Sequence, residues 1–498
     1  MLIDVCNFWH KHPALWVSLH ALIGAAFFFH PTWTYLFFIP VLLAPFFFFA
    51  GGVHKLCQSL LLLAASYLYT AAVSPNFSTE KITQTGTAYF SPQQVKPYQN
   101  AYFNGWMIQG EIRQFISGEG RTLQRLPCSI VLDSPPPPAN YTYLLHGELK
   151  LLNPYSALFK PTKEEHWRPI EPLWTLAEMR LQMKQRVRKA IDKHTPVKKT
   201  ASFFRALATG DIDDYILATQ LNQTGLQHIL AISGFHFSLI AAFAGWFLRP
   251  FKNRSFYDIA LVCLLLLYFL YIGPSASVQR AWAVLSLYFF ARLFGKSASP
   301  LNLLGVALFL EILLTPTVLL NLGFHLSFLC TAAILLFYKP MKRLMLYLAP
   351  QREKEQWLKM SLGQKTGYVL VSLMRNSLAL NLAVHALSIA VLLNLFHCFP
   401  LLSIYYNLFF PFCAALSLFL LISAALFASW FSALALLIHK ANIFFLQFFL
   451  DLVIYPPAKL NFNIYYKLPF TWLMFILAVC LAFGIFLNRS VDENCSQG

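Results

Sequence analysis

Residues 226–240 have the sequence LQHILAISGFHFSLI, an apolar run with several polar side chains within about three helical turns. Polar groups at membrane depth raise the free energy unless neighbouring helices hydrogen-bond them or a watery interior contains them. Hydroxyl groups and imidazoles in such a run could act in catalysis, bind a metal ion or line a conduit. The residues that could carry this chemistry are His228, Ser233, Gly234, His236 and Ser238.

Nucleophilic catalysis requires a serine and a base within hydrogen-bond reach, together with an oxyanion hole. Ser233 and His236 are three residues apart and can approach each other on a helix, so an intramembrane serine hydrolase stays open as an alternative. However, the local AISG lacks the second glycine that a Gly-x-Ser-Gly site has. We therefore assign no catalytic residue.

The two histidines of this run do not form a metal site. His228 and His236 are separated by about 12 Å along a helix, and no Asp, Glu or Cys lies in the run with them. The sequence therefore predicts no metal and no cofactor. A packing role stays open for each residue, because small residues allow close helix contacts and interhelical hydrogen bonds can satisfy hydroxyl groups and imidazoles. Gly234 also weakens a helix by about 1 kcal/mol relative to Ala, which predicts an interruption at Ser233 and Gly234.

The composition indicates a polytopic α-helical membrane protein. Of the 498 residues, 57% are hydrophobic and only 12% are charged, with a mean hydropathy of +0.55. We predict about twelve membrane spans, at 14–30, 33–50, 55–73, 225–248, 256–272, 278–294, 301–315, 320–338, 376–396, 401–427, 429–450 and 470–487.

The charge distribution predicts the orientation. The chain has 38 Lys and Arg residues against 21 Asp and Glu, a formal net charge of +17. The loop 339–375 and the short loops that follow the fourth and sixth spans are basic, and all three lie inside if both termini are cytoplasmic. Residues 74–224 then lie outside. The nine cysteines form no C-x-x-C pair, so neither a zinc site nor a disulfide framework is indicated.

The outer segment begins with a predicted β domain. Residues 106–116, 126–133 and 141–152 are rich in Ile, Val, Tyr and Leu and are bounded by Gly and Pro, as strands are. Several short strands without helices predict a small extracytoplasmic β-rich domain, an antiparallel barrel that could be OB-like.

A basic amphipathic helix follows at 172–194. One face carries Leu173, Leu176, Met179, Met183, Val187 and Ile191. The other carries Arg180, Lys184, Arg186, Arg188, Lys189 and Lys193. Such a helix can lie on the outer leaflet of the membrane, in contact with its lipids. Alternatively, the basic face gathers a polyanion such as DNA.

The segment GLQHILAISGFH, residues 225–236, resembles the signature of the ComEC/Rec2 competence family, whose members are DNA-uptake channels of bacterial inner membranes. Five further segments resemble elements of that family in the same order: ALATGD (206–211), GPSASVQRA (273–281), SASPLN (297–302), NLGFHLSFL (321–329) and YNLFFP (406–411). The resemblance covers residues 205–411, and the strand-rich region that precedes it has a similar layout.

The resemblance implies an inner-membrane channel that passes single-stranded DNA into the cytoplasm during natural transformation. The residues that we expect along the DNA path are His228, Ser233, Gly234, His236, Ser238, Arg280, His325 and Asn407. Arg280 is the candidate for a direct phosphate contact, or else it extends to the outer headgroups. His325 stands where the family usually has Gln, so a role that needs Gln is not carried over.

Other family properties are carried over only in part. Many members end in a metallo-β-lactamase-like domain, but this chain has no H-x-H-x-D-H cluster, so we expect a short form without that domain and its nuclease activity. The chain also has no G-x-x-x-x-G-K-[ST] loop. The expected partners are therefore single-stranded DNA, membrane lipids, an upstream DNA receptor and a cytosolic DNA-translocating ATPase, although the proton gradient could also drive transport.

A secondary transporter of an anionic small molecule or lipid-linked substrate stays open as an alternative function. An inverted sequence repeat would favour it, and none is recognisable. The predicted organisation is 1–73, N-terminal anchor helices; 74–171, the β-rich domain; 172–224, basic amphipathic and interfacial helices; 225–338, first part of the channel core; 339–375, a basic cytoplasmic loop; 376–487, second part of the core; and 488–498, a cytoplasmic tail.

Overall fold

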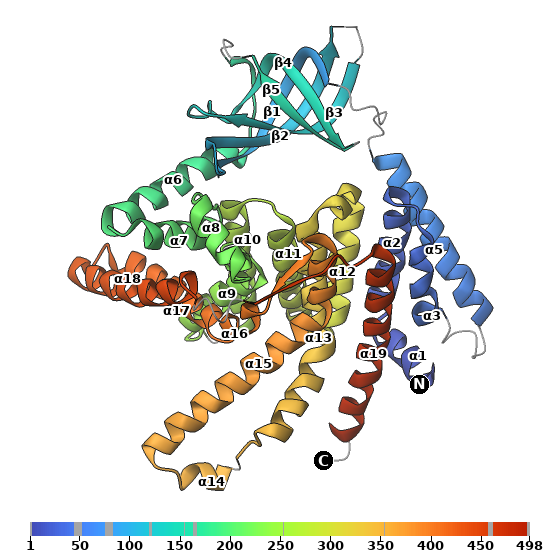
Figure 1. Ribbon diagram of the computed structural model, residues 1–498, viewed down its shortest axis with the longest axis vertical. Coiled ribbons are helices and arrows are strands. Elements are labelled where there is room, and N and C mark those ends of the chain that lie inside the picture. Colours follow the sequence, from blue (N-terminus) through green and yellow to red (C-terminus); the bar gives the residue numbers. More distant parts are fainter. Residues whose placement is uncertain are drawn as a thin grey trace.

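A β barrel stands at one end of a helical bundle in the computed structural model (Figure 1). Helix α6 (Leu176–His194) lies beneath the barrel, and a hairpin of α13 (Leu322–Leu348) and α15 (Leu362–Leu395) extends from the bundle in the opposite direction. The structure describes residues 2–43, 52–74, 83–118, 122–153, 155–162, 167–251, 253–352, 354–456 and 462–495.

Within the described residues, six strands form the barrel sheet: β1 (Thr83–Gln99), β2 (Asn104–Ser117), β3 (Thr122–Leu132), β4 (Tyr141–Asn153), β5 (Ser156–Pro161) and β6 (Arg168–Pro172). Their order is β1-β2-β3-β5-β4-β6, and β1 also pairs with β4, which closes the first five strands into a barrel. The strands pair antiparallel except for β3 with β5. Fully buried Phe90, Ile108 and Phe115 fill the interior.

The sequence predicted three of these strands. Residues 106–116, 126–133 and 141–152 are confirmed as strands β2, β3 and β4. Strand β1 was not predicted, because it contains two prolines and many glutamines, which interrupt the usual composition of a strand. Its pairing with both β2 and β4 stabilises it in spite of that composition.

The helices before residue 225 are α1 (Leu2–Lys11), α2 (Pro13–Phe29), η1 (Trp33–Phe38), α3 (Ile39–Leu42), α5 (Gly52–Val73), α6, α7 (Lys198–Thr209) and α8 (Tyr215–Gln223). The core elements are η2 (Gln227–Ile229), α9 (Gly234–Leu248), α10 (Arg254–Ile272), α11 (Ala276–Leu293), α12 (Pro300–Leu314), η3 (Pro316–Leu320), α13, α14 (Lys354–Leu358), α15, β7 (Cys398–Pro400), α16 (Leu402–Tyr406), α17 (Phe410–Phe427), α18 (Ser432–Ile454), β8 (Asn463–Tyr465) and α19 (Phe470–Cys495).

Among the described residues, seven helices are long and apolar enough to cross a membrane, namely α5, α10, α13, α15, α17, α18 and α19. Shorter apolar helices occupy 13–29, 33–42, 234–248 and 300–314. A polytopic membrane protein with a β domain is thus confirmed, whereas the count of about twelve spans is not. Part of the predicted span 33–50 lies outside the described residues, since the description stops at residue 43.

Two segments that we predicted to be a loop and a tail are largely helical in the structure. In the predicted loop 339–375, α13 continues through Pro340 to Leu348, and α15 begins at Leu362. Lys, Arg and Gln are good helix formers, so a charged stretch can extend two membrane helices as readily as connect them. Likewise, α19 continues to Cys495 through most of the predicted tail, and residues 496–498 lie outside the described residues.

Candidate functional site

The chain is not helical between α8 and α9. After the short turn η2, residues 230–233 are irregular, and α9 begins at Gly234. The predicted span 225–248 is therefore not a single helix, and the interruption expected at Ser233 and Gly234 is present. Gly225 helps to hold this break: its φ is +73°, and a Cβ atom there would lie 2.4 Å from the Cβ of Ser403 on α16.

Ser233 and His236 cap the N-terminal end of α9. The amide nitrogen of Ser233 donates to Nδ1 of His236 at 3.3 Å, and Oγ of Ser233 lies 3.3 Å from the same nitrogen. His236 is buried. In the described part of the chain, no carboxylate is hydrogen-bonded to this imidazole, so the pair has the geometry of a helix cap without the third group that orients a catalytic base.

Arg280 of α11 lies against the first residue of α9. Its Nη2 is 3.1 Å from the position that a Cβ atom of Gly234 would occupy. Its Nη1 donates to the carbonyl oxygen of Ser327 on α13 at 2.8 Å, and its guanidinium lies over the ring of Phe328. Arg280 is only 8% exposed, so the alternative in which it extends to the headgroups is wrong. Three elements, α9, α11 and α13, meet at this guanidinium.

Two further imidazoles approach this region. His228 of η2 interacts electrostatically with His236 and with His385 of α15. The Nδ1 of His385 lies 3.2 Å from the hydroxyl oxygen of Ser388, whereas its buried Nε2 has no hydrogen-bond partner in the described part of the chain. The side chain of His228 is exposed, and its Nδ1 lies 3.1 Å from the carbonyl oxygen of Gly225. The histidines thus come together from three separate elements, which spacing along the sequence could not reveal.

The remaining predicted path residues lie at other helix ends. Ser238 is exposed on α9 and donates to the carbonyl oxygen of Gly234 at 2.8 Å. His325 is exposed near the beginning of α13, where its Nε2 lies 2.6 Å from the carbonyl oxygen of Leu319. Asn407 is partly buried between α16 and α17. Among the described residues, no hydrogen bond joins His325 or Asn407 to Arg280 or to the beginning of α9.

Glu311 of α12 is an acidic residue near Arg280, and its place within a predicted span marks it as part of a polar interior. It is 8% exposed and interacts electrostatically with Arg280, and neither of its buried carboxylate oxygens has a hydrogen-bond partner among the described residues. The signal that points to it is a lone acid in an apolar helix, because such residues within membrane segments commonly have a function.

Helix α6 does not present the basic face that its sequence predicts. Lys184 and Arg188 point inward and donate to Asp211 at 3.0 and 2.9 Å, and Arg180 donates to the carbonyl oxygens of Leu270 and Gln93. By contrast, the apolar face exposes Met179 and Met183. The helix is rotated in this way because the carboxylate of Asp211 lies beneath it. Of the predicted DNA-gathering surface, the exposed residues are Arg186, Lys189 and Lys193.

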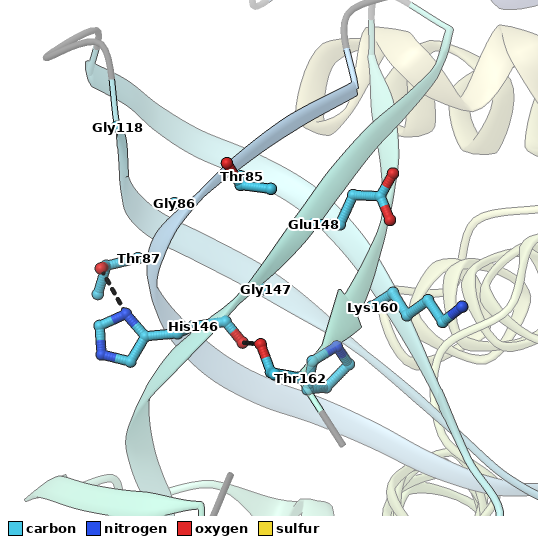
Figure 2. A pocket seen from close by; sticks show the side chains of 10 residues that line it. Thr85, Gly86, Thr87, Gly118, His146, Gly147, Glu148, Lys160 and Thr162 are labelled. Carbon is cyan, nitrogen blue, oxygen red and sulfur yellow. Dashed lines mark hydrogen bonds between the residues drawn. The ribbon is translucent and has the colours of Figure 1, made fainter. Parts of the chain in front are cut away.

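A groove of about 570 Å³ crosses strands β1, β4 and β5 on the barrel (Figure 2). On its wall Thr87 Oγ1 lies 2.7 Å from Nδ1 of His146, and Thr162 donates to the carbonyl oxygen of His146. Glu148 on β4 lies opposite Lys160 on β5 in the strand register. Because the negative charge of Glu148 offsets the positive charge of Lys160, the groove lacks the net positive charge that binding a chain of phosphates requires.

Comparison with known proteins relates residues 210–490 to a known family. A model of the Competence protein family matches residues 210–490. The ComE operon protein 3 of Bacillus subtilis (strain 168) is 28% identical over 278 residues, which cover 52% of this chain and 32% of that protein. The chain thus spans about a third of the length of this relative. No solved structure matches the chain.

Proposed function

Because the chain belongs to the competence protein family, as the match over residues 210–490 shows, we propose that it is an inner-membrane channel that passes single-stranded DNA into the cytoplasm. The observation that carries this proposal is the polar group at the beginning of α9, which is Arg280 beside Gly234 within a bundle of apolar helices. The matched region contains every residue that we predicted along the path.

The chemistry at the beginning of α9 suits a phosphate group. The first backbone N–H groups of a helix have no partner within the helix and attract anions. The guanidinium of Arg280 lies beside them, and its Nη2 and Nε make no hydrogen bond among the described contacts. A fork of N–H donors matches the geometry of a phosphate.

His228 supports a path through this region. Its side chain is exposed on η2 and interacts electrostatically with His236 and His385, so an imidazole is available beside the beginning of α9. A phosphate chain requires a wet and polar path, because it cannot cross hydrocarbon without its hydration. Neutral imidazoles can donate to a phosphate weakly enough to release it again, as conduction requires.

The barrel supports a nucleic-acid role as well. Its strand order, with β1 closing on β4 and a parallel pair of β3 and β5, is the order expected of an OB-like fold, a fold that commonly binds single-stranded nucleic acid. Tyr102 at the turn between β1 and β2 is 99% exposed, and Trp174 before α6 is 91% exposed. Exposed aromatic rings of this kind can stack on bases without regard to sequence.

Removal of the gene tests the proposed function. A deletion strain should still bind labelled DNA at its surface but should not accumulate labelled single strands in the cytoplasm, and the intact gene should restore entry. Because the chain has no nucleotide-binding loop of the Walker type, we propose that a cytosolic ATPase pulls the strand and that a separate receptor delivers it. Normal entry in the deletion strain would contradict the channel.

We predict that the barrel is extracytoplasmic and that α14 is cytoplasmic. The basic residues between 339 and 375 favour the inside, and Figure 1 draws the barrel and α14 at opposite ends of the molecule. Reporter fusions at Pro136 and Gln351 should therefore give opposite results for the two sides of the membrane. The same result at both positions would contradict the direction of transport as well as the orientation.

A further inference from the structure

A cluster of basic side chains lies where the barrel, α6 and the helical core meet. Lys184 is 3% exposed and donates to Oδ1 of Asp211 at 3.0 Å, while Arg188 donates to Oδ2 at 2.9 Å. One carboxylate therefore binds two cations. The Nε of Arg188 is also buried there, and no described residue forms a hydrogen bond with it.

Two further cations lie at this cluster, Arg180 on α6 and Lys96 on strand β1 of the barrel. Arg180 donates to the carbonyl oxygen of Gln93 on β1, and it packs with Gln94 around Gly273, where a Cβ atom would lie 3.1 Å from each of the two side chains. Residues 94 and 96 point to the same face of a strand, so Lys96 extends toward α6 as Gln94 does. Lys96 accordingly interacts electrostatically with both Asp211 and Arg180.

The charges in this cluster do not balance. Lys96, Arg180, Lys184 and Arg188 surround the single carboxylate of Asp211, and the described residues give Lys96 no ion-pair or hydrogen-bond partner. Burial lowers the pKa of Lys96 and that of Lys184, which reflects the free energy needed to keep like charges out of water. An anion beside these groups would remove much of that cost.

We propose that Lys96 and Arg188 bind one phosphodiester group of single-stranded DNA between the barrel and the helical core. The Nε of Arg188 has no hydrogen-bond partner among the described residues, and the ammonium group of Lys96 is a second donor of the kind that such a group accepts from. The site would hold the strand after it leaves the barrel and before it reaches the beginning of α9. DNA as the occupant rests on the proposed function, whereas a phosphate group as the ligand rests on the cluster itself.

The test measures binding of a fluorescent oligothymidylate to the full-length protein in nanodiscs of phosphatidylcholine. Lys96→Gln should weaken binding about tenfold, because a charge-assisted hydrogen bond to phosphate is lost. It should also reduce the slope of log affinity against log salt by about 0.7, the value for one phosphate of a single strand. Lys198→Gln removes the same charge from an exposed position at the beginning of α7 and should change the affinity by about twofold at most.

Other outcomes separate the inference from the proposed function. Equal affinities for Lys96→Gln and the wild type would overturn the site even if the deletion strain imports no DNA. A tenfold loss of binding would support the site even if deletion leaves import unchanged. Nanodiscs that also contain phosphatidylglycerol distinguish the source of the phosphate: if Lys96→Gln alters only the effect of this lipid, the site binds a headgroup and DNA as its occupant is wrong.

Discussion

Replacing His228 with aspartate is expected to lower DNA import at least about tenfold, because a fixed negative charge beside the path repels each phosphate that passes. The His228 side chain is exposed, and the hydrogen bond described for it is to the carbonyl oxygen of Gly225 at 3.1 Å. Its loss should therefore affect the free energy of unfolding by only about 1 kcal/mol. Entry of labelled DNA is measured at equal abundance of protein in the membrane.

The matched control is His228→Asn, which has a similar size and shape to the aspartate variant but carries no charge. It should import DNA at close to the wild-type rate. Loss of import in both variants would indicate that the imidazole itself is required. If the aspartate variant imports normally at wild-type abundance, the path lies elsewhere and the histidines near the beginning of α9 are packing groups.

Replacing Asp211 with asparagine is expected to lower the free energy of unfolding by about 3–5 kcal/mol, because a buried ion pair that loses one partner leaves an uncompensated charge. The effect should be at the upper end of that range, since Lys184 and Arg188 both lose their counter-ion. Thermal unfolding of the purified protein measures this as a lower midpoint, and the abundance in the membrane should fall with it.

Asp192→Asn is the control for a surface pair. Asp192 binds Arg205, but its side chain is half exposed, so its loss should alter the free energy of unfolding by about 0–1 kcal/mol. Equal midpoints for the Asp211 and Asp192 variants would contradict the burial of the cluster beneath α6. They would then indicate that water reaches Lys184 and Arg188 in solution.

Local composition and residue spacing were sufficient to predict those helices and strands whose secondary structure does not depend on contacts with distant segments. The apolar runs predict membrane helices, since an apolar segment of sufficient length has few other stable environments. Strands β2, β3 and β4 follow from composition and turns. The family also follows from the order of six short motifs, several of which the structure locates at the ends of helices: Gly210 after α7, Ser233 before α9 and Asn321 before α13. Helix ends need particular residue types, and those types are visible in the sequence.

The sequence alone thus determined a polytopic membrane protein with a β domain, its family and the residues at the beginning of α9. Only the tertiary structure decided which face of α6 is buried, because that depends on Asp211, a residue 23 to 27 positions away along the chain. It likewise decided that Arg280 meets Gly234 and that His385 approaches His228. Periodicity records only whether a side chain is polar, and the partner that makes burial of a charge stable comes from a distant segment.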